Sequence, residues 1–341
     1  MYRIAYLSHV SSTWVRQRPH IIFEGLSSHY DVAWFEFGTI LDLLTKRNVI
    51  VEVPLRRFRH KYIYDIINSW LVGIQLKTRI RKMDLIWVTS PLLVDRIEFV
   101  DKKIVYDCMD DFSHFYHGKT SEKIASRETD FLSKVDQVIF SSLHLMNKYE
   151  QHVKSKKALI RNAINSERIK RFAQVAYSPK RKVVYWGTIS SWFDWGAIDI
   201  FTELGFDVEI YGPVEGQIEE KYQDLLFGPV DFELLPTISQ GACILIMPFR
   251  MTELIKGVDP VKLYEYIATK AIVVAPYYPE IERFSDFIFT YHSYNDLKTW
   301  AKDSLSPVSE NIVSLRREFL KRNTWEHRIS SICHLVNELK Q

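Results

Sequence analysis

The sequence predicts an α/β protein with two doubly wound parallel sheets, each in a domain of its own. Short runs of consecutive apolar residues, typical of parallel strands buried on both faces, alternate with longer segments of helical periodicity. The chain has 341 residues, too many for one ordinary core and about right for two domains. With 47% hydrophobic and 26% charged residues, its composition is that of a folded globular protein.

The apolar runs place the strands along the chain. In the first half the predicted strands are Arg3–Leu7, Val32–Phe37, Leu85–Val88, Ile104–Tyr106, Val138–Ser141 and Ala158–Ile160. In the second half they are Val183–Trp186, Asp207–Tyr211, Cys243–Met247, Ile272–Ala275 and Phe287–Thr290. The polar, proline-containing segment 178–182 favours a domain break near residues 165–180. We therefore expect one domain over residues 1–170, a second over 171–320, and a C-terminal helix over 321–341 that packs back on the first domain.

Charge and cysteine content exclude several classes of protein. A net charge of +3 gives no field that would attract nucleic acid, so no nucleic-acid partner is expected. The three cysteines, Cys108, Cys243 and Cys333, are far apart and lack metal-ligand spacing, which indicates a reducing compartment. The polar N-terminus predicts a strand and no signal peptide, and no run approaches the ~20 apolar residues of a membrane-spanning helix. We expect a cytoplasmic protein with no metal or cofactor.

The segment 258–275 predicts a helix with a start suited to anions, followed by a buried strand. Asp259 is expected to be the N-cap, with Pro260 at the first helical position. The first turn, which begins with Val261, offers free N–H groups and the positive end of the helix dipole. Lys262 lies in this turn and Glu265 follows on the same face, so a diphosphate and a sugar hydroxyl would bind side by side. The alternative is an exposed Lys–Glu pair on an ordinary helix.

Two other strand ends in the second half carry candidate phosphate ligands. The strand Val183–Trp186 runs into a turn at Gly187, where the backbone would approach a phosphate closely, and Thr188 adds a hydroxyl donor. Arg250 follows the strand Cys243–Met247 and is a second candidate cation. The alternatives are a plain turn and a surface arginine.

The first half places carboxylates at the end of the strand Ile104–Tyr106. Asp110 and Asp111 suit a general base that takes a proton from an acceptor hydroxyl, and we prefer them to Asp107 for this role. The alternative is that they cap the following helix or bind loop amides. The loop after the first strand has no G-x-G-x-x-G pattern and no P-loop lysine, which argues against a dehydrogenase-type dinucleotide site.

That first loop leads into a segment with candidate acceptor ligands. Arg16 and His20 would bind an acceptor there, and a helix-capping role is the alternative for either one.

Residues 55–82 combine a basic excess with an apolar helical pattern. The basic residues are Arg56, Arg57, Arg59, Lys61, Lys77, Arg79, Arg81 and Lys82, and the apolar ones are Ile63, Ile66, Ile67, Trp70, Leu71 and Ile74. This pattern suits contact with an anionic membrane surface or with a pyrophosphate-bearing acceptor. The alternative is a helix that packs its apolar face on the sheet and keeps a solvated basic rim.

Several of these motifs together resemble the bacterial GT-B glycosyltransferases of the "glycosyl transferases group 1" type, in particular the teichuronic-acid and exopolysaccharide branch. The resemblance covers nearly the whole chain. It is carried by Arg18–His20, Tyr106–Asp111, Tyr185–Thr188 with Trp192–Asp194, Asp259–Tyr266 and Thr324–Glu326. The block Pro-x-Lys-x-x-Glu-Tyr is its most specific part.

The resemblance implies a sugar transfer from a nucleotide-diphosphate sugar to a hydroxyl of a glycan or lipid-linked acceptor, without a metal ion, across a central cleft. Lys262 and the helix start would hold the diphosphate, and Glu265 the ribose hydroxyls. Many group 1 enzymes carry a Glu where this chain has Gly257, so both a retaining outcome and an inverting one, with Asp110 or Asp111 as base, stay open. The other functions considered are a nucleotide-sugar epimerase or hydrolase on the same fold and a non-catalytic partner subunit.

Overall fold

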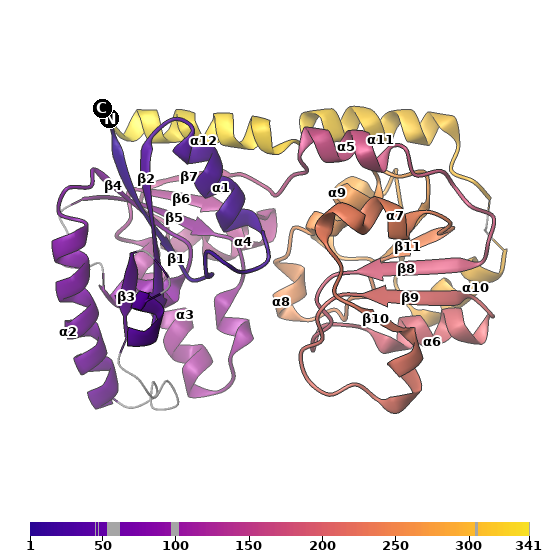
Figure 1. Cartoon of the computed structure of the whole chain (residues 1–341), viewed down its shortest axis with the longest axis horizontal. Helices are drawn as coiled ribbons and strands as arrows, with labels where there is room; N and C mark the ends of the chain where they lie inside the picture. The colour runs from indigo at the N-terminus through magenta and orange to yellow at the C-terminus, as the bar shows by residue number, and fades with distance from the viewer. Residues whose placement is uncertain (45, 47, 53–61, 97–101, 304–305, 341) are drawn as a thin grey trace. The chain divides into compact units, whose positions relative to one another are not determined.

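The computed structural model describes residues 1–44, 46, 48–52, 62–96, 102–303 and 306–340. The chain divides into two compact units (Figure 1). Unit 1 comprises Met1–Arg161 and Arg328–Gln341, and unit 2 comprises Asn162–His327. Each unit is built on one sheet of parallel strands, so the prediction of two doubly wound α/β domains is confirmed.

Unit 1 contains a sheet of seven strands in the order β3-β2-β1-β4-β5-β6-β7, and every neighbouring pair is parallel. The strands are β1 Arg3–Ser8, β2 Asp31–Gly38, β3 Val49–Val51, β4 Leu85–Val88, β5 Lys103–Cys108, β6 Gln137–Phe140 and β7 Lys156–Leu159. The inner strands β4 and β6 are buried along their whole length, as expected for strands covered on both faces.

The helices of unit 1 connect these strands. They are α1 Arg18–Ser27, η1 Ile40–Leu44, α2 Tyr62–Arg79, η3 Pro91–Arg96, η4 Phe112–Phe115, α3 Lys119–Leu132, α4 Leu143–Tyr149 and η5 Glu150–His152. The C-terminal helix α12 (Trp325–Leu339) belongs to unit 1 from Arg328 onward. There the hydroxyl of Tyr30 donates to the carbonyl of Cys333, and Ile329 packs against Gly25.

Unit 2 contains a sheet of six parallel strands in the order β10-β9-β8-β11-β12-β13. The strands are β8 Lys182–Trp186, β9 Asp207–Tyr211, β10 Leu226–Gly228, β11 Ile244–Ile246, β12 Ile272–Pro276 and β13 Phe289–Tyr291. The helices are α5 Ser166–Phe172, α6 Trp195–Glu203, η6 Glu220–Leu225, η7 Phe232–Leu234, α7 Leu235–Ser239, α8 Glu253–Lys256, α9 Val261–Tyr266, η8 Pro279–Phe284, α10 Tyr294–Asp303 and α11 Glu310–Arg322. Its core is one continuous cluster of aliphatic and aromatic side chains from both faces of the sheet.

Every predicted strand overlaps a strand of the structure. The two strands that the sequence analysis did not predict, β3 and β10, have three residues each and lie at the edges of their sheets. Residues 162–170, expected in the first domain, lie in unit 2. None of the described helices is both long enough and apolar enough to span a bilayer.

The helix predicted within residues 55–82 is α2, and residues 55–61 of that segment lie outside the described residues. The apolar residues of the predicted pattern and the buried residues of this helix lie on different faces. The side chains that pack inward are Val72, Leu76 and Ile80, whereas Ile67, Trp70 and Ile74 are exposed. The alternative that this apolar face packs on the sheet is therefore wrong for Ile67, Trp70 and Ile74, because α2 buries a second apolar stripe instead.

Candidate functional site

The sheet order of unit 2 places candidate ligands at its topological switch point. The chain continues from β8 to β9 on one side of the sheet and later returns to β11 on the other side of β8. In open parallel sheets the carboxyl ends of two such strands leave room for a ligand. Gly187 follows β8 and residues 247–250 follow β11, so both loops lie at this position.

Gly187 and Lys262 come together at the switch point. Gly187 has φ +137°, a conformation that favours glycine, and a Cβ there would lie 2.1 Å from Cε of Lys262 and 2.6 Å from its Nζ. The missing side chain therefore makes room for the lysine beneath the turn. The Nζ atom lies 5.6 Å from the ring centroid of Tyr185 and 5.4 Å from that of Phe249.

The ammonium group of Lys262 is half-buried in this position. Burial lowers the pKa of Lys262, while the nearby charge of Glu265 acts in the opposite direction. Among the described residues, no carboxylate forms an ion pair with Lys262, and its neighbours are two aromatic rings. A cation in a partly desolvated site without an anionic partner is suited to bind an anion from solution.

Glu265 is buried, and its two carboxylate oxygens have different partners. One accepts from the indole Nε1 of Trp186 at 2.9 Å, and the other forms an ion pair with Arg168 of α5. The expected alternative, an exposed Lys–Glu pair on an ordinary helix, is therefore wrong. Trp186 and Arg168 fix the orientation of the carboxylate one helical turn from Lys262.

The prediction that Asp259 caps this helix is wrong. Helix α9 begins at Val261 with Pro260 at the N-cap position, and the side chain of Asp259 does not cap it. Instead, the buried Asp259 carboxylate accepts from the backbone N–H of Asn162 at 2.6 Å and from the hydroxyl of Tyr264 at 3.1 Å, and it pairs with Arg283. These contacts hold the segment before α9. The Asp259 carboxylate binds these partners and is therefore not available to cap the helix.

The remaining predicted donor ligands lie around the same strand ends. Thr188 is half-buried, and its carbonyl accepts from the hydroxyl of Tyr185 at 2.9 Å. The backbone N–H of Arg250 donates to the carbonyl of Trp192, while its side chain is exposed. The contacts do not bring Arg250 to Lys262.

Unit 1 places its carboxylates at the end of β5. The buried Asp107 receives a bidentate pair of hydrogen bonds from Arg18, with the Arg18 Nη2 to Asp107 Oδ1 distance at 2.8 Å. Asp110, by contrast, is half-buried. Burial raises the pKa of Asp110 to about 7, with Arg18 opposing the shift and the neighbouring carboxylates adding to it.

Asp111 is fully engaged in contacts of its own. Its buried carboxylate pairs with Lys148 of α4, accepts from the hydroxyl of Ser113 at 2.9 Å, and lies 2.9 Å from Nδ1 of His114. Burial acts to raise the pKa of Asp111, but the hydrogen bonds from Lys148, His114 and Ser113 lower it overall. The two adjacent carboxyl groups, which the sequence did not distinguish, thus have opposite environments.

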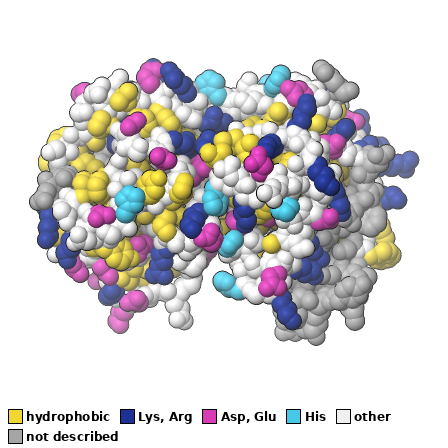
Figure 2. All heavy atoms as spheres, turned by 180° about the vertical axis from the view of Figure 1, so that it is seen from behind, with side chains coloured by type: hydrophobic (Ala, Val, Ile, Leu, Met, Phe, Trp, Pro, Cys, Tyr) yellow, Lys and Arg dark blue, Asp and Glu magenta, His cyan; other side chains and the backbone are white. Residues whose placement is uncertain are grey.

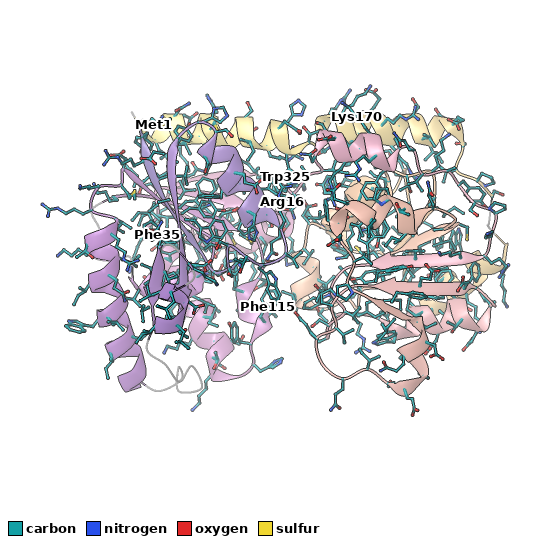
Figure 3. The ribbon with its side chains drawn as sticks, in the orientation of Figure 1. Met1, Arg16, Phe35, Phe115, Lys170 and Trp325 are labelled. Atoms are coloured by element: carbon teal, nitrogen blue, oxygen red, sulfur yellow. The ribbon has the colours of Figure 1, made fainter. Side chains whose placement is uncertain are left out.

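The predicted acceptor ligands Arg16 and His20 lie at the start of α1, where Figure 3 labels Arg16. Arg16 is exposed and pairs with Glu24. His20 is buried, with Nδ1 accepting from the backbone N–H of Gln17 at 3.3 Å and Nε2 3.0 Å from the carbonyl of Ser11. These contacts give His20 the capping role that was its alternative.

Several residues that shape the two sites carried no local signal in the sequence. Arg168 and Glu265 are separated by 97 residues, as are Asn162 and Asp259. In unit 1, Glu128 accepts from the hydroxyls of Tyr106 and Tyr149, and burial raises its pKa to about 7. In the part of the chain that the structure describes, no group of three or more His, Cys, Asp or Glu side chains is placed to hold a metal ion.

Several solved structures share the fold of this chain, and they confirm the predicted GT-B architecture. Sucrose-phosphate synthase from Thermosynechococcus elongatus aligns with a TM-score of 0.72 and 13% identity over 99% of each chain. Anabaena HepE, solved in complex with UDP and glucose, aligns with a TM-score of 0.67 and 14% identity over 99% of this chain and 100% of HepE. A glycosyltransferase from Rickettsia africae aligns with a TM-score of 0.61 and 13% identity over 100% of this chain and 99% of its own. No protein-family model and no curated protein sequence matches the chain.

Proposed function

We propose that the chain is a glycosyltransferase that moves a sugar from a nucleotide-diphosphate sugar to a hydroxyl of an acceptor. Unit 2 holds the donor and unit 1 supplies the acceptor site. The observation that carries this proposal is the half-buried ammonium group of Lys262, which lies beneath the Gly187 turn without a carboxylate partner among the described residues. The fold shared with HepE, whose structure holds UDP and glucose, supports it.

In the donor site, Lys262 binds the diphosphate and Glu265 accepts from the ribose hydroxyls. The Gly187–Thr188 turn and the α9 start at Val261 offer N–H groups to the phosphate oxygens, and Arg250 adds charge from the β11 loop. A cation at the leaving diphosphate performs the task of a metal ion, so we propose a metal-independent hexosyltransferase. Asp259 and Pro260 hold the position of α9.

In the reaction, the acceptor oxygen attacks the anomeric carbon, and the bond from that carbon to the diphosphate oxygen breaks. The nucleoside diphosphate leaves with the bonding electrons, and the acceptor proton passes to a base. We assign that base to Asp110, since its half-buried carboxyl group has a pKa of about 7, close to working pH. Asp111 positions the loop through Lys148 and His114. Arg16 binds the acceptor at the α1 start.

We place the enzyme in bacterial polysaccharide synthesis of the exopolysaccharide or teichuronic-acid type. The acceptor is a glycan or lipid-linked oligosaccharide at the inner face of the cell membrane, with residues 55–82 as the membrane contact. The basic excess of that segment supports this location.

Titration calorimetry with UDP, GDP, ADP and TDP tests the donor site. The matched variants are Lys262→Met, which keeps the length of the side chain, and Lys180→Met, which removes an exposed lysine elsewhere in unit 2. A charge-assisted contact to phosphate contributes about 1.5–3 kcal/mol, so Lys262→Met should weaken the best binder by roughly 10- to 150-fold. Lys180→Met should bind like the wild type. Binding of none of the four, or equal affinity in both variants, would overturn the proposal.

A further inference from the structure

Helix α2 of unit 1 carries an apolar stripe that none of the described residues of its own unit covers. The helix buries one side against the sheet through Val72, Leu76 and Ile80. On the opposite side, the exposed fractions are 51% for Ile67, 68% for Trp70 and 47% for Ile74. These three residues follow the i, i+3, i+7 spacing of one helix face, so they form a continuous stripe.

Basic side chains extend this stripe beyond its apolar part. Lys77 lies on the same helix face one turn after Ile74, and Arg81 and Lys82 follow the end of the helix; all three are exposed. The sequence from Ile66 to Lys82 contains no acidic residue. Figure 2 shows Lys and Arg side chains at the right-hand rim, where α2 lies. We call Ile67, Trp70, Ile74, Lys77, Arg81 and Lys82 the α2 stripe.

A second exposed apolar group lies at the same edge of the sheet. The edge strand β3 is tied to α2 by hydrogen bonds between Gln75 and Val51 and from Arg79 to the carbonyl of Val49. The short helix η1 also contacts β3. It leaves four large apolar side chains exposed, namely Ile40, Leu41, Leu43 and Leu44. Isolated exposed apolar residues are ordinary, but two such groups around one edge strand mark an interaction surface.

We infer that the α2 stripe binds the surface of an anionic lipid bilayer. Ile67 and Ile74 would enter the boundary between headgroups and acyl chains. The amphipathic ring of Trp70 suits the same boundary. Lys77, Arg81 and Lys82 would contact the anionic headgroups. A second copy of the chain is a poorer occupant, because a symmetric contact would bring its basic residues against these. The inference rests on the membrane location proposed above and names its contact surface, but it does not depend on the donor site.

Vesicle flotation of the full chain tests this inference. The vesicles contain either phosphatidylcholine alone or equal parts of phosphatidylcholine and phosphatidylglycerol. The wild type should float with the anionic vesicles at low salt, and less at high salt. Each basic residue near an anionic surface changes binding by about fivefold, so the triple variant K77Q/R81Q/K82Q should lower the partition coefficient on the order of 100-fold. Trp70→Gln should lower it roughly tenfold.

Two matched controls distinguish binding through the α2 stripe from a general effect of net charge or of exposed apolar side chains. K154Q/K170Q/K180Q removes the same charge from exposed lysines elsewhere, and Leu315→Gln removes an exposed apolar side chain from α11. Both should float like the wild type, and all variants should keep their unfolding midpoint. The inference would be overturned if the control triple variant lost flotation equally, or if the wild type did not float. It would also be overturned if the protein did not bind vesicles but self-associated, and Trp70→Gln abolished that self-association. Nucleotide titration of the same variants reports on the donor site separately.

Discussion

At the residue scale, the two adjacent carboxyl groups at the end of β5 have different tasks. Asp110→Asn should slow sugar transfer by roughly 10²- to 10⁴-fold, because the general base is lost, while the free energy of unfolding is unchanged or higher. Asp111→Asn should instead lower the free energy of unfolding by about 1–3 kcal/mol, since Lys148 and His114 lose a charged partner. Transfer assays and urea unfolding of both variants measure the contrast. Equal activity of Asp110→Asn and the wild type would rule out Asp110 as base.

The pH dependence of activity follows from the same group. A base must be deprotonated, so kcat/KM should rise with pH through an apparent pKa of about 7 and reach a plateau above it. Asp110→Asn should remove that rise from its residual activity. A wild-type profile that is flat from pH 5 to pH 9 would contradict the assignment.

Stability should move in the opposite direction with pH. The folded pKa of Asp110 lies above the unfolded value, so the folded state binds the proton more tightly. The stabilisation from this group is full below about pH 4 and is lost as the pH rises to about 7. Comparing urea unfolding of the wild type and Asp110→Asn across this range isolates the contribution of the one carboxyl group.

At the element scale, the turn after β8 keeps a space for the end of Lys262. A Cβ at Gly187 would displace a flexible side-chain end, which costs little stability beyond the cost of the positive φ. Gly205 has φ +74° and open space around it, so Gly205→Ala carries the backbone cost alone. Both alanine variants should lose stability, Gly205→Ala by ~1 kcal/mol and Gly187→Ala by more, because φ +137° lies further from the left-handed region open to L residues. Only Gly187→Ala should lose nucleotide affinity, and equal nucleotide binding by the two variants would contradict the account.

One buried arginine connects α11 to the rest of unit 2. Arg316 donates to the backbone carbonyls of Thr269, Ala271 and Phe287, and burial lowers its pKa to about 10. Arg316→Met leaves three carbonyls without this donor and should cost roughly 2–4 kcal/mol in urea unfolding. The exposed neighbour Arg317 is the matched control, and Arg317→Met should change stability by less than about 0.5 kcal/mol.

The sequence predicted elements where one local pattern dominates. Continuous apolar runs such as Leu85–Val88 predicted the strands, because a strand buried on both faces consists of consecutive apolar residues. The three-residue strands β3 and β10 are too short for such a signal. Local pattern also failed at Asp259, whose carboxylate is bound by Asn162 and Arg283 instead of capping α9. A contact between residues about a hundred positions apart, such as Asn162 and Asp259, cannot be predicted from the local spacing of residues.

At the scale of the whole molecule, the two units have separate sheets and separate cores. This division assigns the proposed donor ligands to unit 2 and the proposed base to unit 1. The sequence could predict two α/β domains from apolar runs and chain length. It could not distinguish Asp110 from Asp111, because their difference arises from Arg18, Lys148 and Glu128, which folding brings to the end of β5.

Hydrogen exchange of the full chain, with and without the nucleoside diphosphate that binds best, tests the central claim most directly. The claim is that the donor diphosphate binds beneath the Gly187 turn and at the start of α9. Binding should slow amide exchange in peptides that span residues 187–189 and 261–265, and it should leave β1, β4 and β5 of unit 1 unchanged. The protection should disappear in Lys262→Met. Protection confined to unit 1, or unaltered protection in that variant, would contradict the account.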